Sequence, residues 1–257
     1  MGLNFSPDVN YWPEHDCARA YWSQQTLPSY RELLADTVEW LRPKSGESWL
    51  DLGCGGGRLT RALWESSSGK VRDILGIDCA AVNAEAYRRL NQTLKPTPQP
   101  EQIRFRAADF LDGLASLETN TFHGVVSGLS IQYAESFCPR TKKYTTEAYE
   151  RVLQEVCRVL RSGGRFVFSV NVPNPSWAKV GWQSFIAVFS CNPLRFICDG
   201  LRMWKYGNWV KREAAKGRFH YLPAKEVVEK LQTVGFLQTE YRLSYAGQAY
   251  VFRCLKT

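Results

Sequence analysis

The stretch Leu50-Asp51-Leu52-Gly53-Cys54-Gly55-Gly56-Gly57-Arg58 decides the fold of this chain. A short apolar run enters a turn made mostly of glycine, and a helical pattern over residues 58–65 follows it. A strand, a glycine turn and a helix in this order place free backbone N–H groups and the positive end of a helix dipole at one edge of a parallel sheet. The stretch therefore predicts a site for a nucleotide-like ligand.

The spacing of the glycines narrows the class of ligand. The dinucleotide fingerprint requires the pattern G-x-G-x-x-G. Here Gly53 and Gly55 are followed by Gly57, so the third glycine falls one residue early, and the acid Asp51 stands two residues before the first glycine. An NAD-dependent oxidoreductase stays an alternative because it would share the strand, the turn and an acid such as Asp78, but the spacing disfavours it.

Short apolar runs alternate with helical patterns along the chain, which is typical of βαβ units and a parallel sheet. Strands are expected at residues 48–52, 73–77, 102–107, 123–129 and 165–170, and helices at 29–41, 58–65, 80–90 and 146–160. A helix at 224–234 precedes two strands, 236–243 and 249–255, that predict a closing hairpin. We expect one domain over residues 1–257, with a lid-like segment at 1–28 and a helical cap inserted at 173–219.

Five landmarks follow one another along the chain. They are Asp51-x-Gly53-x-Gly55-x-Gly57, Gly76-Ile77-Asp78, Ala107-Ala108-Asp109-Phe110, Phe122 to Ser127, and Leu153 to Phe166. In this order they resemble the class I S-adenosylmethionine (SAM)-dependent methyltransferases, in particular the type 11 and quinone-methyltransferase members. The resemblance covers roughly residues 30–170. It implies an α/β fold with a Rossmann-like, seven-stranded, mostly parallel sheet, helices on both faces and a C-terminal antiparallel hairpin.

SAM carries a sulfonium, an amino acid tail and an adenosine, so its site needs oxygen acceptors at several places. Asp51 suits the ammonium, Asp78 suits both ribose hydroxyls, and Asp109 suits the adenine amino group. The alternative for Asp78 is a solvated aspartate in a turn, and the alternative for Asp109 is a helix N-cap. The glycines allow the backbone to approach the ligand closely, and residues 127–129 are expected beneath the methionine portion. The predicted cofactor-binding residues are Asp51, Gly53, Gly55, Gly57, Asp78, Ala108, Asp109, Phe110, Ser127 and Gly128.

Methyl transfer is an in-line displacement at a carbon that positive sulfur already activates, so much of the rate comes from orienting the acceptor and excluding water. Gln132 and Tyr133 follow the fourth strand, where this family often contacts the methyl group or the acceptor, and we expect them at the reaction centre. His15 and His220 are candidates for a base that removes the acceptor's proton, with packing or surface roles as the alternative. The eight cysteines form no C-x-x-C pair, so no metal site is expected.

Substrate choice is expected to lie in the cap at 173–219. Residues 171–220 hold eight Lys or Arg against two Asp or Glu, interleaved with Trp, Phe and Tyr. Three interpretations compete: the buried face of a cap, a hydrophobic acceptor pocket whose basic mouth contacts an anionic membrane, or a surface that stacks bases and pairs phosphates. The sequence holds no further RNA motif, so a nucleic-acid partner is not expected.

These observations predict methyl transfer from SAM to an oxygen or carbon of a small, lipophilic or aromatic acceptor. The alternatives are an RNA or protein methyltransferase that uses the basic cap, and a non-catalytic SAM-binding protein. Residues 1–13 lack a basic region followed by an apolar one, and no run approaches the roughly 18 apolar residues that cross a bilayer, so a cytoplasmic location is expected. No feature of the sequence indicates an oligomeric state.

Overall fold

The computed structural model describes residues 12–14, 18–19, 27–176, 179–180 and 207–257. Within these residues seven strands form one sheet in the order β3-β2-β1-β4-β7-β9-β8, and β5 and β6 form a separate hairpin. The first five strands of that order pair in parallel, whereas β9 runs antiparallel to both β7 and β8. The mostly parallel α/β sheet with a closing antiparallel hairpin is therefore confirmed. The strands are β1 Ser48–Leu52, β2 Asp73–Asp78, β3 Ile103–Ala107, β4 Phe122–Gly128, β5 Ser136–Cys138, β6 Lys143–Thr145, β7 Leu160–Asn171, β8 Phe236–Ser244 and β9 Ala249–Lys256.

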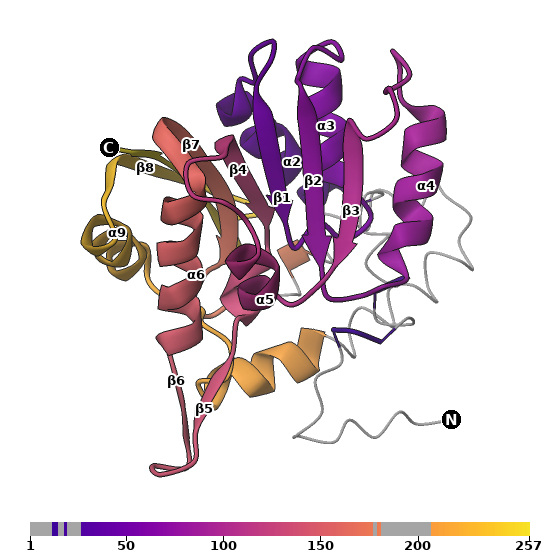
Figure 1. Cartoon of the computed structure of the whole chain (residues 1–257). Helices are drawn as coiled ribbons and strands as arrows, with labels where there is room; N and C mark the ends of the chain where they lie inside the picture. Colours follow the sequence, from indigo (N-terminus) through magenta and orange to yellow (C-terminus); the bar gives the residue numbers. More distant parts are fainter. Residues whose placement is uncertain (1–11, 15–17, 20–26, 177–178, 181–206) are drawn as a thin grey trace, which may run out of the picture.

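Helices cover both faces of the sheet (Figure 1). Side chains alternate across a strand, and the neighbours Val125 and Val126 of β4 accordingly belong to two different cores. Val125 packs in a core with residues of α5, α6 and α9, and Val126 in a core with residues of α2, α3 and α4. The helices are α2 Pro28–Leu41, α3 Arg58–Ser66, α4 Asn83–Thr93, α5 Phe110–Ala115, the 3-10 turn η2 Ile131–Tyr133, α6 Glu147–Val159 and α9 Ala224–Thr233.

Three local features differ from the sequence-based expectation. α4 starts at Asn83 and not at residue 80, because the Asp78 carboxylate accepts the backbone N–H of Ala80 and holds that residue in a turn. The glycines at 163 and 164 do not cap α6, which ends at Val159; they lie inside β7, where its pairing with β4 shifts register. The sequence predicts no bounds for the short helix α5 and indicates it only through the alternative of Asp109 as a helix N-cap.

The β5–β6 hairpin was also missed by the sequence reasoning. Its two strands are three residues each, Ser136–Cys138 and Lys143–Thr145, and pair in antiparallel register. Such short strands leave too little alternation for a period to be recognised. In Figure 1 the hairpin extends away from the body at the edge where the parallel strands end.

The lid-like segment expected at 1–28 and the cap expected at 173–219 lie largely outside the described residues. Of the cap, residues 207–215 form a helix that lies beside the carboxyl edge of the sheet (Figure 1). In the part of the chain that the structure describes, no helix has the length and apolar character to span a bilayer. The cytoplasmic location stays a prediction.

Candidate functional site

The glycine turn at residues 53–57 joins β1 to α3 at the carboxyl edge of the sheet. Gly53, Gly55 and Gly57 have positive φ angles of 70°, 48° and 76°. A side chain on Gly53 would collide with Ser130, whereas a Cβ on Gly55 would meet nothing within 4 Å. The backbone is thus packed tightly below Gly53 and open to a ligand at Gly55.

Asp51, at the end of β1, is buried beneath this turn. Its Oδ2 atom accepts hydrogen bonds from the backbone N–H of Thr60 at 3.0 Å and from the Thr60 hydroxyl at 2.8 Å, while Oδ1 is buried and pairs with no described residue. Burial raises the pKa of Asp51 from 3.8 to about 7, although the Thr60 hydrogen bonds favour the charged form. The free oxygen suits a cationic ligand group that would restore the charge.

Asp51 is held in place by a chain of contacts that the sequence reasoning did not identify. The Thr60 hydroxyl lies 2.7 Å from the Tyr87 hydroxyl, and Tyr87 comes from α4. Any side chain at Gly76 would collide with that phenol, so the glycine of the Gly76-Ile77-Asp78 landmark makes room for Tyr87. The signal was present in the sequence, but only the structure shows what the glycine accommodates.

Asp78 ends β2 and connects the second strand to the glycine turn. One carboxylate oxygen accepts the N–H of Gly55 at 2.9 Å, and the other accepts that of Ala80 at 2.9 Å. Burial raises the pKa of this carboxyl group, and the two backbone hydrogen bonds oppose the shift. The Asn83 side chain also forms a hydrogen bond with this carboxylate, so three of its about four acceptor positions are used and one is left for a ligand hydroxyl.

Asp109 and Phe110 follow β3 and start α5. Asp109 is exposed and caps α5, because its Oδ1 accepts the N–H of Leu111 at 3.1 Å. The backbone N–H of Ala108 donates to the Asp78 carbonyl at 3.0 Å, and the Phe110 ring lies 3.2 Å from the Cβ position of Gly53. The structure therefore brings the residues predicted to contact adenine against the glycine turn. Asp109 is also the N-cap of α5, as the alternative interpretation of this residue predicts.

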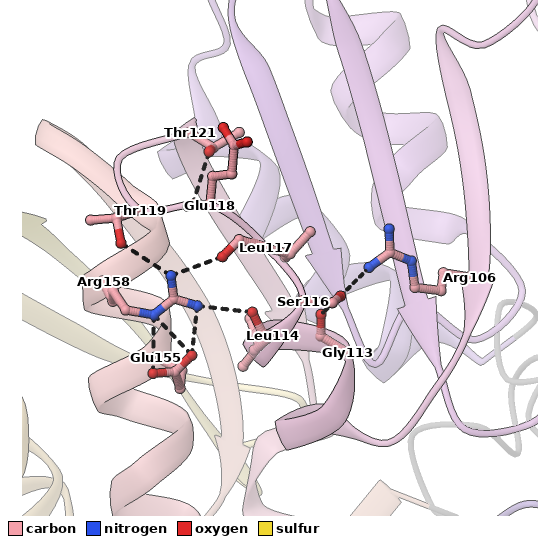
Figure 2. A network of polar contacts seen from close by, with 10 residues as sticks. All are labelled: Arg106, Gly113, Leu114, Ser116, Leu117, Glu118, Thr119, Thr121, Glu155 and Arg158. Carbon is pink, nitrogen blue, oxygen red and sulfur yellow. Dashed lines mark hydrogen bonds and ion pairs between the residues drawn. The ribbon is translucent and has the colours of Figure 1, made fainter.

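Arg158 of α6 fixes the other end of α5 (Figure 2). Its guanidinium donates to the carbonyls of Leu114 at 2.9 Å and Leu117 at 2.8 Å, and to the Thr119 hydroxyl at 3.2 Å. The same group forms an ion pair with Glu155 at 2.7 Å. Helix carbonyls at a C-terminus lack intrahelical partners, so Arg158 supplies the donors that α5 needs.

Ser127 and Gly128 end β4 beside β1. The fully buried Ser127 donates to the Leu52 carbonyl at 2.8 Å, and its hydroxyl lies 2.6 Å from that of Ser130. A Cβ at Gly128 would lie 2.9 Å from Leu59. Ser127 has a structural partner for its hydroxyl, and a role beneath the methionine portion of SAM stays a prediction.

Gln132 connects two distant parts of the chain. Its side-chain Oε1 accepts the backbone N–H of Asn171 at 2.6 Å, and its backbone carbonyl accepts that of His220 at 2.9 Å. The side chain is fully buried. Gln132 thus contacts both ends of the segment 172–219, a position for which the sequence gives no signal.

Tyr133 lies in a cluster of aromatic rings that we call the aromatic cluster: Trp12, Tyr133, Trp209 and Phe219. The centroid of Tyr133 is 4.3 Å from that of Trp12 and 5.0 Å from that of Phe219, and Trp209 is 5.5 Å from Phe219. The Tyr133 hydroxyl lies 3.2 Å from the Tyr221 hydroxyl. The cluster joins the N-terminal segment, the loop after β4 and the helix 207–215.

The structure describes only one of the two histidines that are candidates for the base. His15 lies outside the described residues. His220 is 5% exposed, and its Nε2 atom lies 3.0 Å from the Ala134 carbonyl. A carbonyl only accepts, so Nε2 carries the proton, and burial lowers the pKa of the ring. Catalysis by either histidine stays a prediction.

Arg218 is a buried cation that the sequence reasoning did not single out. Its side chain and that of Glu213 are each 3% exposed and pair at 3.3 Å. The guanidinium also binds Glu135 through two contacts, one of which, Nη2 to Oε1, measures 3.2 Å. Glu213 belongs to the helix 207–215 and Glu135 to the loop that follows β4, so Arg218 fastens the helix to that loop. Among the described residues no group of three His, Cys, Asp or Glu side chains is placed to hold a metal ion.

Comparison with known proteins places this site in a family. Residues 50–168 match the family described as methyltransferase domain. The demethylmenaquinone methyltransferase of Symbiobacterium thermophilum is 26% identical over 225 residues, 85% of this chain and 78% of that protein. The eEF1A lysine and N-terminal methyltransferase of Homo sapiens is 26% identical over 159 residues, 62% of this chain and 21% of that protein. The N-methyltransferase NodS of Bradyrhizobium japonicum, solved with S-adenosylhomocysteine, has a TM-score of 0.56 at 16% identity, with 91% of each chain covered.

The matched residues coincide with the site. Asp51, the glycine turn, Asp78, Asp109 and Ser127 all lie within residues 50–168. The strand order and the closing antiparallel pair agree with what the resemblance implied. The family match, the methyltransferase relatives and the fold together support a class I SAM-dependent methyltransferase.

Proposed function

We propose that this chain binds SAM at the glycine turn and transfers its methyl group to an oxygen or carbon of a small, lipophilic or aromatic acceptor. When bound, SAM supplies a methyl group on a positively charged sulfur. The chain's own residues bind the two reactants, orient them in line and keep water from the transfer.

Several features of the site fit SAM. The buried Oδ1 of Asp51 is an acceptor without a described partner and suits the ligand ammonium. The open space at Gly55 leaves room for the ligand against the backbone, beside the Asp78 carboxylate that would accept from the ribose hydroxyls. Asp109 uses Oδ1 as a helix cap, and its other oxygen suits the adenine amino group.

The aromatic cluster is the observation that supports the acceptor class. Tyr133 follows the end of β4, next to the predicted methionine side of the SAM site, and its ring contacts Trp12 and Phe219. Apolar rings beside the Tyr133 hydroxyl, which lies 3.2 Å from that of Tyr221, suit an acceptor that is mostly apolar and carries few polar atoms. The relative named a demethylmenaquinone methyltransferase, which aligns with most of this chain, acts by its name on such a compound.

We propose a positioning role for His220. Its ring donates to the Ala134 carbonyl and its backbone N–H to the Gln132 carbonyl, so it holds the two residues on either side of Tyr133.

The test is methylation with labelled SAM of three separate acceptors: a demethylmenaquinol-type naphthoquinol, a cell protein extract and total RNA. We expect label in the naphthoquinol, and lower incorporation by Tyr133→Phe with unchanged affinity for S-adenosylhomocysteine. Label only in protein would replace our acceptor with the class named for the human relative. Label only in RNA would refute a small acceptor, and binding without turnover on any of the three would refute catalysis of this reaction.

A further inference from the structure

The β5–β6 hairpin, residues 136–145, forms an arm that projects from the carboxyl edge of the sheet (Figure 1). Phe137 is 53% exposed although it packs at 5.2 Å against the Tyr144 ring. The turn residues 139–142 and Lys143, the first residue of β6, are all exposed. The arm therefore presents an apolar ring and a short turn to the surroundings, and neither is required by the core.

The turn of the arm is strongly basic. Arg140, Lys142 and Lys143 lie within four consecutive positions, and residues 136–146 contain no acid. None of the three cations forms an ion pair with any residue in the described ranges. The acid that precedes the arm, Glu135, is already bound by Arg218. The positive charge of the tip thus has no partner within the described fold.

The base of the arm is fixed to the body. The Ser136 hydroxyl donates to the Thr145 carbonyl at 2.8 Å and accepts the backbone N–H of Ala148, in α6, at 3.3 Å. The guanidinium of Arg218 lies 5.8 Å from the centre of the Tyr144 ring. These contacts hold the arm in one direction, so its tip is presented without an ordering cost at the moment of contact.

We propose that the arm docks this protein reversibly on an anionic lipid surface, with the three cations at the headgroups and Phe137 at the boundary with the acyl chains. Cations beside an exposed aromatic side chain suit that boundary, where the charged groups stay hydrated and the ring is partly buried. Binding of single-stranded nucleic acid needs a basic groove that follows the backbone together with flat stacking platforms. A narrow tip whose one exposed ring packs edge-on against Tyr144 provides neither.

The size of the effect follows from the charges. Each Lys or Arg at an anionic surface strengthens binding by about fivefold, so three cations give about a hundredfold. Such binding is reversible and depends on salt, because the charges lie within a Debye length of the headgroups. The arm alone therefore predicts a peripheral contact and not a permanent anchor.

The test is flotation of the full chain with vesicles of phosphatidylcholine alone and of phosphatidylcholine mixed with phosphatidylglycerol. Two variants remove the proposed contacts: Phe137→Ser, and the triple change R140Q/K142Q/K143Q. Matched controls make the same kinds of change on exposed residues elsewhere. They are Leu237→Ser and the triple change R88Q/R104Q/K225Q.

We expect flotation only with the anionic vesicles, a loss of about a hundredfold in partition for the arm triple variant, and a smaller loss for Phe137→Ser. Equal losses for the arm and control triple variants would show a general charge effect and overturn the proposal. Arm-dependent binding of a single-stranded RNA oligonucleotide without binding to anionic vesicles would overturn it in favour of nucleic acid. The proposed membrane contact rests on the arm alone. Methylation of protein only would refute the proposed acceptor, but it would not change the expected flotation.

Discussion

At the scale of single residues, Asp51 couples ionisation to both folding and ligand binding. Its pKa is raised from 3.8 to about 7 by burial, so the folded chain keeps a proton there that the unfolded chain has lost. The stabilising effect of that proton is fully present below about pH 4 and is lost as the pH rises to about 7. We expect the free energy of unfolding without ligand to fall by about 4 kcal/mol over this range from this group. Urea unfolding at several pH values measures it, and Asp51→Asn should remove this part of the slope.

Ligand binding at Asp51 should release the same proton. The ammonium of S-adenosylhomocysteine favours the charged carboxylate, so the affinity is expected to rise with pH up to about 7 and then level off. Calorimetry at about pH 6 in two buffers of different ionisation enthalpy would detect the released proton. A release that persists in Asp51→Asn would assign it to another group and contradict the ammonium contact.

A substitution at Gly55 should affect ligand binding more than it affects the stability of the fold. A Cβ there meets nothing within 4 Å, although φ is 48°. Gly55→Ala is therefore expected to lose only about 1 kcal/mol of stability from backbone strain. Its affinity for S-adenosylhomocysteine should fall more than about tenfold, because the methyl group occupies the space assigned to the ligand.

Gly46→Ala is the matched control for this change, since φ is 79° and the space is equally open, but the residue precedes β1. It should lose similar stability and bind the ligand normally. Unchanged binding by Gly55→Ala would move the cofactor away from the turn.

At the scale of elements, α5 depends on Arg158 for its position. Arg158→Met removes the donors to the Leu114 and Leu117 carbonyls, and we expect it to lower the free energy of unfolding by about 2 kcal/mol. Because Asp109 starts the same helix, the variant should also discriminate less between S-adenosylhomocysteine and S-inosylhomocysteine, which lacks the adenine amino group. Calorimetric affinities for the two ligands give this ratio.

Two further variants separate the possible reasons for a change in that ratio. Arg151→Met alters an exposed arginine of α6, the helix that also holds Arg158, and should leave the ratio of the two affinities unchanged. Asp109→Ala should abolish the discrimination. If it does not, the adenine contact itself is wrong, whereas an effect of Asp109→Ala without one of Arg158→Met would limit Arg158 to stability.

The long periodic elements were predictable from the sequence and the short ones were not. β1 was predicted at its observed bounds, and α2 within one residue, because their apolar patterns are strong and their ends are marked. α5 and the strands of the arm are too short to show a helical or strand period. Arg158 of α6 stabilises α5, and the contact of Ser136 with Ala148 of α6 stabilises the arm. Sequence periodicity carries no information on such contacts.

At the scale of the whole molecule, the ion pair between the buried Arg218 and Glu135 fastens the helix 207–215 to the loop after β4. Arg218→Met removes the cation that binds both Glu135 and the buried Glu213, although Glu213 keeps Lys216 at 2.7 Å as a charged partner. We expect it to destabilise the protein by about 3 kcal/mol. Adding Glu213→Gln should recover part of this loss. Urea unfolding measures both variants, and Arg253→Met, which breaks a pair with the exposed Glu240, should cost less than about 1 kcal/mol. Equal losses for Arg218→Met and Arg253→Met would contradict the tie between the helix and the loop.

The candidate site was only partly predictable for a related reason. Asp51, the glycines, Asp78 and Asp109 occur at strand ends, and the topology of a parallel sheet brings strand ends together. Thr60, Tyr87 and Arg218 act through partners that are distant in the sequence or on other elements. Their type and spacing are ordinary, and only the packing of elements assigns them a role.

Gln132 has a consequence for how such an enzyme changes over evolutionary time. It contacts the backbone at Asn171 and at His220, so the two ends of the intervening segment are fixed by one residue of the catalytic domain. A segment with fixed ends behaves as an exchangeable cassette, because the entropy of closing a loop grows only slowly with its length. Segments of different length and composition can therefore be inserted between these two points while the sheet stays unchanged, provided that they keep Arg218, which binds Glu135. New acceptor specificities would then arise by recombination at the cassette boundaries, and an engineer could graft foreign segments at the same two junctions.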